Sequence, residues 1–393
     1  MFKHLFKLIW NKRNQNFLFL SEILISFLVI FAVFSYLTYY YQNYRQPIGF
    51  DYKRVWAIEY GNGELTKNRD SLVMFYDLLY KSLKSMPQIE EVSYSSGNYP
   101  YADSFMSTGL TQNGQKFDRV SNYFVGADYK NVWNVSLTEG RWFLPEDAIS
   151  KNRHVIINET LKKAIFGNAQ ATGKLIGDFE GANKLKVIGV MQDIKADGDF
   201  SPVSNAMFSQ LDSNGLSDNH TILLKVAETA DATFEGNLYK FMATSMKSAV
   251  EIRHVDEMRD ARNERTYIPM IIFSIIAAFL IINVALGLFG VLWYNISKRK
   301  SEIGLRRAIG ASGASVSYQL VAEALILATI SLALGCFFAI QFPLLNVFDI
   351  PSSVYITAIL LSVAFIYLLV LACSLYPGRQ AAAIHPAIAL HEE

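Results

Sequence analysis

The 393-residue sequence has only two cysteines, Cys336 and Cys373, and both lie inside long apolar stretches. A domain between those stretches therefore has no disulfide and must rest on its own hydrophobic core. Excess charge of one sign is also lacking, because 36 Lys and Arg residues balance 35 Asp and Glu residues. This balance, with 51% hydrophobic residues, excludes nucleic-acid-binding and disordered chains.

Motifs for catalysis are missing as well. The six histidines are scattered without an HExxH pattern, and no serine lies in a G-x-S-x-G pattern. The segment 167–175, GNAQATGKL, has five residues between its glycines and a leucine after its lysine, whereas a phosphate loop has four and a hydroxyl. We expect a helix C-cap and turn there. The sequence predicts no catalytic residue, no metal site and no ATPase site on this chain.

What the sequence does contain is four long apolar stretches, at residues 17–40, 268–294, 316–340 and 354–376. A helix of roughly 25 residues crosses the ~30 Å hydrocarbon core of a bilayer. The first stretch could be a secretory signal peptide, but its length favours an uncleaved helix. We predict a multi-pass α-helical membrane protein with four transmembrane helices.

The short segments between these stretches differ in basic residues. Residues 1–16 carry four Lys or Arg residues and residues 295–315 carry five, whereas residues 341–353 carry none. The positive-inside rule then places both termini and the loop 295–315 in the cytoplasm. Residues 41–267 and the short loop 341–353 are expected outside, and residues 377–393 form a cytoplasmic tail.

Residues 1–16 also show a helical pattern. Apolar residues recur at i, i+3, i+4, i+7 and i+8 from Phe2 to Trp10, with the lysines mostly off that stripe. We predict a helix lying in the inner membrane interface, with a frayed basic tail as the alternative.

Residues 41–267 mix strand and helix patterns. RVWAIEYG, IEEVSYSSG, KLKVIGVMQDI and HTILLKVAE have strand patterns; SLVMFYDLLYKSLKSMP and ATFEGNLYKFMATSMK have helical ones, and HVIINETLKKAIFG runs from strand into helix. We predict a large α/β or α+β domain, with room for two subdomains.

Two acidic residues, Glu22 and Glu323, are the charged residues within the predicted spans, each about two turns from the cytoplasmic end. A charge at the bilayer centre costs about 2.5 to 3.5 kcal/mol or more. These carboxylates either snorkel to the inner interface or pair with Lys298, Arg299, Arg306 or Arg307 of the basic loop.

The basic loop reads as an amphipathic helix from Ser297 to Ile309. Its apolar positions are Ile303, Leu305, Ala308 and Ile309, and Glu302 stands four residues before Arg306, the spacing of a supporting ion pair. The residues 310–313, GASG, should end it, and Ser312 or Ser315 could cap the next helix. Such a helix suits docking onto a cytoplasmic protein.

SKRKSEIGLRRAIGAS, in this loop, resembles the signature loop of the MacB/FtsX-like ABC transporter permease family. NVWNVSLTEGRWF, VIINETLKKAIFG with TGKLI, and KVIGVMQDIK resemble the family's extracytoplasmic domain, and YPGRQAAAIHPAIALHEE its C-terminal tail. In that family the loop is the coupling helix that contacts the ATPase. The residues to which this role carries over are Arg299, Glu302, Ile303, Gly304, Leu305, Arg306, Arg307, Ile309 and Gly310.

The resemblance also implies partners. Macrolide exporters of the family carry a fused N-terminal ATPase, whereas this sequence starts at the amphipathic segment, so a separate cytoplasmic ABC ATPase holding ATP-Mg is expected. A second permease paired through the first two spans, membrane lipid and a periplasmic adaptor or envelope protein are further expected partners, and nucleic acid is not. The location implied is the bacterial inner membrane.

The predicted function is to transmit ATP-driven motion of that ATPase to the extracytoplasmic domain, for export or extraction of a peptide, drug or lipoprotein-like substrate. The alternative is an ATPase-independent scaffold or sensor that recruits or activates an envelope enzyme. No motif in the sequence separates the cargoes.

Overall fold

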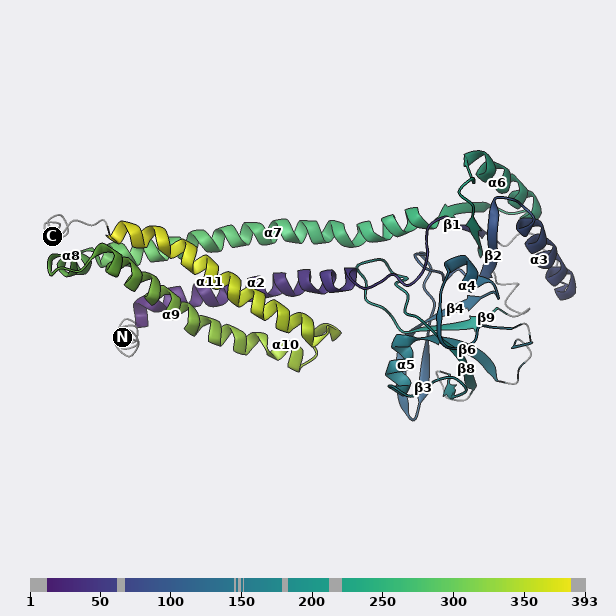
Figure 1. The fold of residues 1–393 in the computed structure, drawn as a ribbon, viewed down its shortest axis with the longest axis horizontal. Helices are drawn as coiled ribbons and strands as arrows, with labels where there is room; N and C mark the ends of the chain where they lie inside the picture. Colours follow the sequence, from purple (N-terminus) through teal and green to yellow (C-terminus); the bar gives the residue numbers. More distant parts are fainter. Residues whose placement is uncertain are drawn as a thin grey trace. The chain divides into compact units, whose positions relative to one another are not determined.

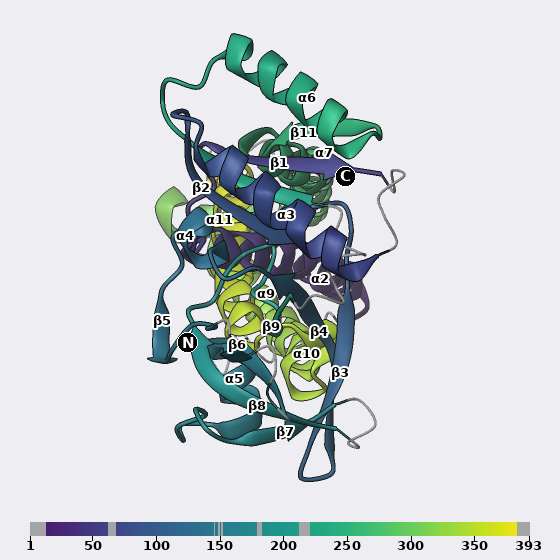
Figure 2. The ribbon, with the colours of Figure 1, turned by 90° about the vertical axis from the view of Figure 1, so that its right-hand side faces the viewer.

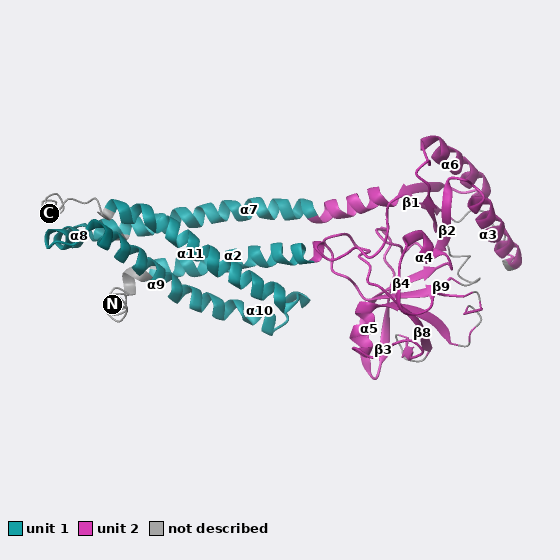
Figure 3. Ribbon diagram, in the orientation of Figure 1, with its two compact units in different colours: residues 1–42, 267–393 teal, residues 43–266 magenta. Residues whose placement is uncertain are grey.

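The computed structural model describes residues 13–61, 68–144, 146–147, 150, 152–178, 183–211 and 221–382. The chain divides into two compact units (Figure 3): residues 1–42 with 267–393, here the helical unit, and residues 43–266, here the α/β unit. The helix predicted at residues 1–16 and the tail 377–393 lie largely outside the described residues.

The helical unit contains the long helices of the chain for most of their length (Figure 1). They are α2 (Arg13–Tyr44), α7 (Val255–Lys298), α9 (Gly313–Ala339) and α11 (Ser352–Ala382), with short helices α8 (Lys300–Ala308), α10 (Gln341–Leu344) and η3 (Val347–Asp349). Residues 43–44 of α2 and 255–266 of α7 belong to the α/β unit. Four helical stretches among the described residues are long and apolar enough to cross a membrane: Phe19–Tyr44, Val255–Lys298, Gly313–Leu344 and Ser352–Gln380. The four predicted spans are therefore confirmed as apolar helices.

Helices α2, α9 and α11 share one hydrophobic core. Phe27 of α2 is fully buried against Gly335 of α9, where an added Cβ would lie 2.5 Å from the Phe27 ring. The Ser331 hydroxyl of α9 donates to the Leu20 carbonyl of α2 at 2.9 Å. Ala358 and Ile366 of α11 belong to the same cluster, as does Leu288 of α7. The missing side chain at Gly335 is what lets α2 and α9 approach closely.

The α/β unit is built on a sheet that has, among its described residues, eleven strands. They are β1 (Val55–Tyr60), β2 (Ile89–Ser95), β3 (Ser107–Gln112), β4 (Gln115–Val125), β5 (Leu137–Gly140), β6 (Arg153–Asn158), β7 (Leu175–Gly177), β8 (Lys184–Met191), β9 (Ala206–Gln210), β10 (Thr221–Val226) and β11 (Val250–His254). The helices are α3 (Arg69–Lys84), α4 (Tyr129–Trp133), α5 (Glu159–Phe166) and α6 (Ala232–Met246). The strand and helix patterns of the sequence are confirmed at each predicted element.

The sheet has two parts that meet at β4. Strands β11-β1-β10-β2 form an antiparallel part whose one face is covered by α3 and α6 (Figure 2). The other part closes on itself, because β4 pairs with β3 at one edge and with β9 at the other, and the order β4-β3-β7-β8-β6-β9 connects them. Val125 of β4 pairs with Ser95 of β2 and joins the two parts.

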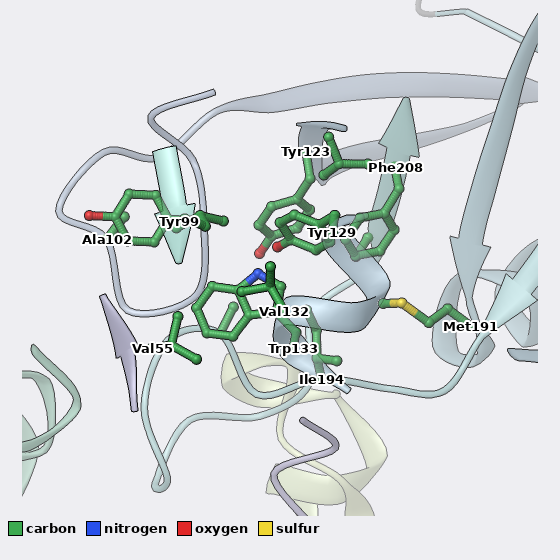
Figure 4. Close-up of a cluster of buried hydrophobic side chains, with 14 of the residues drawn as sticks. Val55, Tyr99, Ala102, Tyr123, Tyr129, Val132, Trp133, Met191, Ile194 and Phe208 are labelled. Atoms are coloured by element: carbon green, nitrogen blue, oxygen red, sulfur yellow. The ribbon is translucent and has the colours of Figure 1, made fainter. Parts of the chain in front are cut away.

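An aromatic core lies where the two parts meet (Figure 4). Tyr129 and Trp133 of α4 are almost fully buried beside Tyr123 of β4 and Phe208 of β9, whose rings stack at 4.8 Å. Such rings bury large areas, which compensates for the lack of disulfides in this unit.

Candidate functional site

The basic loop folds as two pieces rather than one helix. The helix predicted from Ser297 to Ile309 is interrupted: residues 297 and 298 end α7, and α8 begins at Lys300. Arg299 stands between them with φ −105° and ψ 14°, outside the helical region. The prediction of one continuous helix was therefore wrong at Arg299, where the backbone leaves the helical region.

Helix α8 ends where the sequence predicted, at the glycine-containing segment 310–313. Gly310 has φ +103°, a conformation that favours glycine, and its amide donates to the Arg307 carbonyl at 3.1 Å. Ser312 then caps α9, since its hydroxyl accepts a hydrogen bond from the Ser315 amide at 3.2 Å. Of the two serines considered as caps, Ser312 is the one used. The Gly310 turn and the Ser312 cap therefore make α8 a short separate helix between α7 and α9.

One face of α8, here its inner face, packs against neighbouring helices of the same chain. Ile303 is 3% exposed and lies in a small cluster with Val316 and Leu320 of α9. Gly304 beside it is also buried. Two of the residues predicted to couple to the ATPase therefore lie against this chain's own helices rather than at the surface.

Five polar side chains close a ring on the same side. Arg299 Nη1 lies 2.5 Å from Glu323 Oε2, and Arg299 Nε lies 3.0 Å from Glu302 Oε2. Glu302 Oε1 accepts from Arg306 Nη2 at 2.7 Å. Arg306 donates to Gln319 at 2.8 Å, and Gln319 donates to Glu323 at 3.0 Å. We call these five residues the Arg299 ring.

The Arg299 ring fixes the orientation of α8 on α9. The side chains of Arg299 and Glu323 are only 17% and 15% exposed. Burial by itself lowers the pKa of a guanidinium, but hydrogen bonds from Arg299 to Glu302 and Glu323 raise the pKa of Arg299 above its ordinary value. A buried pair adds little net stability but makes the loss of one partner costly, so the ring acts chiefly as an orienting device.

Glu22 has a different environment from Glu323, although the sequence suggested a similar position for both carboxylates near the inner ends of their helices. It lies on α2 against Gly287 of α7, where an added Cβ would fall 1.9 Å from Glu22 Oε1. It is not a member of the Arg299 ring. The pairing with the basic loop that the sequence suggested is therefore seen for Glu323 through Arg299.

The outer face of α8 carries an apolar pair. Leu305 of α8 is 52% exposed, and Ile309, the C-cap residue that follows α8, is 79% exposed. The Ile309 amide donates to the Leu305 carbonyl at 3.1 Å, so the two residues lie one turn apart. Ser301 and Ala308 are exposed as well, whereas Arg307 is half-buried. The apolar positions of the loop thus divide: Ile303 packs against α9, whereas Leu305 and Ile309 are exposed.

Gln319 is the member of the ring that sequence reasoning missed. Its signal was present, because it lies four residues before Glu323 on α9, where a helix places two side chains side by side. As to metals, no group of three or more His, Cys, Asp or Glu residues that could hold an ion occurs among the described residues.

Two family comparisons match this architecture. The sequence model of the MacB-like periplasmic core domain matches residues 17–235, more than half of the chain, and that of the FtsX-like permease C-terminal domain matches residues 274–386. The chain belongs to the MacB/FtsX-like ABC transporter permease family. The second match contains α8 and the whole Arg299 ring.

Among curated relatives, the permease is similar to the macrolide export ATP-binding/permease protein MacB of Aggregatibacter actinomycetemcomitans, 26% identical over 234 residues, or 57% of this chain and 36% of the relative. MacB of Vibrio parahaemolyticus is 24% identical over 336 residues, or 79% of this chain and 47% of the relative. The chain thus spans at most about half the length of these relatives. The crystal structure of the periplasmic region of MacB from Actinobacillus actinomycetemcomitans matches 53% of this chain and 92% of that chain, with 20% identity and a TM-score of 0.39.

Proposed function

We propose that this permease receives the ATP-driven motion of a separate cytoplasmic ABC ATPase through α8 and passes it to the α/β unit outside the membrane. The observation that carries the proposal is the division of α8 into two faces. Its inner face is fastened to α9 by Ile303 and the Arg299 ring, and its outer face presents Leu305 and Ile309. A helix held rigidly on one side and left apolar on the other fits a docking element.

The chemistry of the outer face suits a pocket on a protein partner. Two exposed aliphatic side chains one turn apart resemble the anchors by which an amphipathic helix seats in a groove. The loop 295–315 carries five Lys or Arg residues against a single acidic residue, and this net positive charge steers association with a surface of opposite sign. ATP and its magnesium are proposed to bind on the ATPase and not on this chain.

Helix α7 is the element proposed to carry the motion outward. It is one helix of 44 residues, roughly 66 Å long, whereas the bilayer core is about 30 Å thick. ATP can drive a change of state only through differential binding: shifting a 1:99 equilibrium to 99:1 needs about 5.5 kcal/mol. We propose that α7, which continues from the basic loop into the α/β unit and contains Pro269, transmits such a shift without a polar conduit through the spans.

A second permease and lipid are proposed to cover the apolar surface of α7. Only 11% of its most apolar window is buried, and Ile271, Ile275 and Phe279 are each about half exposed or more. The proposed location is the bacterial inner membrane, with the α8 loop in the cytoplasm and the α/β unit outside, where an adaptor or envelope protein would meet it.

Introducing two charges on the outer face, Leu305→Asp with Ile309→Asp, is expected to abolish co-purification of the ATPase and reduce ATP-driven activity at least tenfold. The reason is that both anchors then place carboxylates in an apolar pocket. Affinity purification in mild detergent, followed by identification of the bound ATPase, measures this.

Ser301→Asp is the matched control, because Ser301 is an exposed α8 residue that supplies no apolar anchor. It should leave the bound ATPase close to the level of the unchanged chain. Undiminished binding in the double variant would show that α8 does not dock there, and would favour the ATPase-independent scaffold.

A further inference from the structure

A buried lysine lies in the loop that follows β8, residues 192–201. Lys195 is only 1% exposed, and burial lowers its pKa while the charge of Asp199 opposes that shift. Lysine is almost never fully buried unless it is paired. Its ammonium group donates to the carbonyl of Asn43 at 2.5 Å and to the carbonyl of Asp199. A lysine buried at this position therefore indicates a structural role for its ammonium group.

The first contact ties the loop to the end of α2. Asn43 belongs to the last turn of α2, where helical carbonyls lack intrahelical partners and a cation is favourable. The Lys195 amide also donates to the Ile48 carbonyl at 2.9 Å, just after the helix. Gly49 has φ +84°, and a Cβ there would lie 1.9 Å from the Asp193 carbonyl oxygen. The chain leaving α2 thus runs in close contact with this loop.

The second contact ties the same loop to α7. The Asp199 carboxylate accepts from Arg259 of α7 through Nε at 3.1 Å and through Nη2. The Asp199 amide donates to the side chain of Asn263, one turn further along α7, at 2.9 Å. Gly198 leaves room there, since a Cβ would lie 3.1 Å from Asn263 Oδ1. Arg259 also lies 4.5 Å from the centre of the Tyr52 ring.

We propose that Lys195 and Asp199 form a joint that fixes the ends of α2 and α7 to one loop of the α/β unit. The role of this joint in transport rests on the proposed function, whereas the joint itself rests on the hydrogen bonds described above. Two helices anchored separately could tilt independently. Held by one loop, they are displaced together. The displacement then enters β8, which directly precedes the loop and pairs with β5, β6 and β7.

Residues near this joint are buried polar groups with bidentate or multiple hydrogen bonds, which specify geometry more sharply than apolar packing does. Lys195 and Asp199 are accordingly positioning residues. Neither is proposed to touch cargo or nucleotide.

The joint is tested first without nucleotide. Spin labels at Gln46 and Asp260, both exposed, report the separation of the two helix ends in the full chain after Cys336 and Cys373 are replaced by alanine. The unchanged chain should give a narrow distance distribution. Lys195→Met, which keeps the aliphatic stem, should broaden or shift it. An equally narrow distance distribution in the Lys195→Met variant would contradict the proposal that Lys195 holds the two helix ends together.

The matched control is Lys225→Met. Lys225 is also a buried lysine of the α/β unit, 7% exposed, but its ammonium pairs with Asp51 at 2.7 Å and with the Lys53 carbonyl. It should leave the distribution narrow. If Lys195→Met fails to fold, Asp199→Asn serves instead, because it keeps the side-chain shape while losing the ion pair to Arg259; a narrow distribution there would equally overturn the joint.

A second measurement separates the joint from the proposed function. In complex with the ATPase, Lys195→Met should keep ATPase binding and ATP hydrolysis but lose about tenfold in ATP-driven activity. If the unchanged chain shows no ATP-driven activity, the proposed function fails, while the nucleotide-free distances still decide the joint. If Lys195→Met retains full ATP-driven activity, the joint has no part in transmission.

Discussion

Arg299→Met is expected to lower the free energy of unfolding of the helical unit by about 3 kcal/mol, because it leaves the Glu323 carboxylate buried without its cation. The side chain of Glu323 is 15% exposed, and besides Arg299 it accepts a hydrogen bond from the side-chain amide of Gln319 at 3.0 Å. The orientation of α8 should loosen as well, so ATP hydrolysis and activity should become uncoupled. Thermal unfolding in detergent and the ratio of activity to hydrolysis measure the two effects.

Two further variants distinguish the ring from simple packing loss. Glu323→Gln alone should cost little, because Arg299 keeps Glu302 at 3.0 Å. Combining it with Arg299→Met should restore much of the lost stability, because no unpaired carboxylate then remains at position 323. If the double variant is as unstable as the sum of the single ones, the two side chains act independently and the ring has no collective role.

Replacing Glu264, Arg265 and Thr266 of α7 with three glycines is expected to reduce ATP-driven activity more than tenfold while ATPase binding persists. Each glycine is about 1 kcal/mol less favourable than alanine in a helix, so three in a row create a flexible hinge within α7. The side chains lost are peripheral, since Arg265 makes an exposed ion pair with Asp103 at 3.2 Å. Activity and hydrolysis of the reconstituted complex measure the uncoupling.

Three alanines at the same positions are the control. They remove the same side chains but keep the helix, so the alanine variant should retain most of its activity. Equal loss in both variants would mean that the side chains matter rather than the rigidity of α7. Equal retention would mean that the motion does not travel along α7.

The spans and the strands of the α/β unit could be predicted because their signals are local. An uncharged apolar stretch of about 25 residues has few options other than a membrane helix. The short, largely apolar runs of β1 and β10, which are buried almost throughout, and the capped helix after β6 are set by neighbours in sequence. The position of α8 between Lys300 and the Gly310 turn was predictable for the same reason, apart from the break at Arg299.

The ring and the joint could not be predicted, because their contacts join distant residues. Glu323 lies 24 residues from Arg299, and Asn43 lies 152 residues from Lys195. The sequence indicated a choice of cations for Glu323 without favouring Arg299, and showed nothing special about Lys195. Which apolar residues of α8 face inward also depends on the packing of α9, which no periodicity within the loop determines.

The central claim is that motion enters at Leu305 and Ile309 and reaches the α/β unit. The direct measurement is the distance between spin labels at Gln115 of this chain and on the α/β unit of the paired permease, in membrane discs with the ATPase, before and after ATP is trapped. We predict a shifted distribution on ATP trapping in the unchanged chain and no shift in Leu305→Asp with Ile309→Asp. The same shift in that double variant, or none in the unchanged chain, would contradict the account.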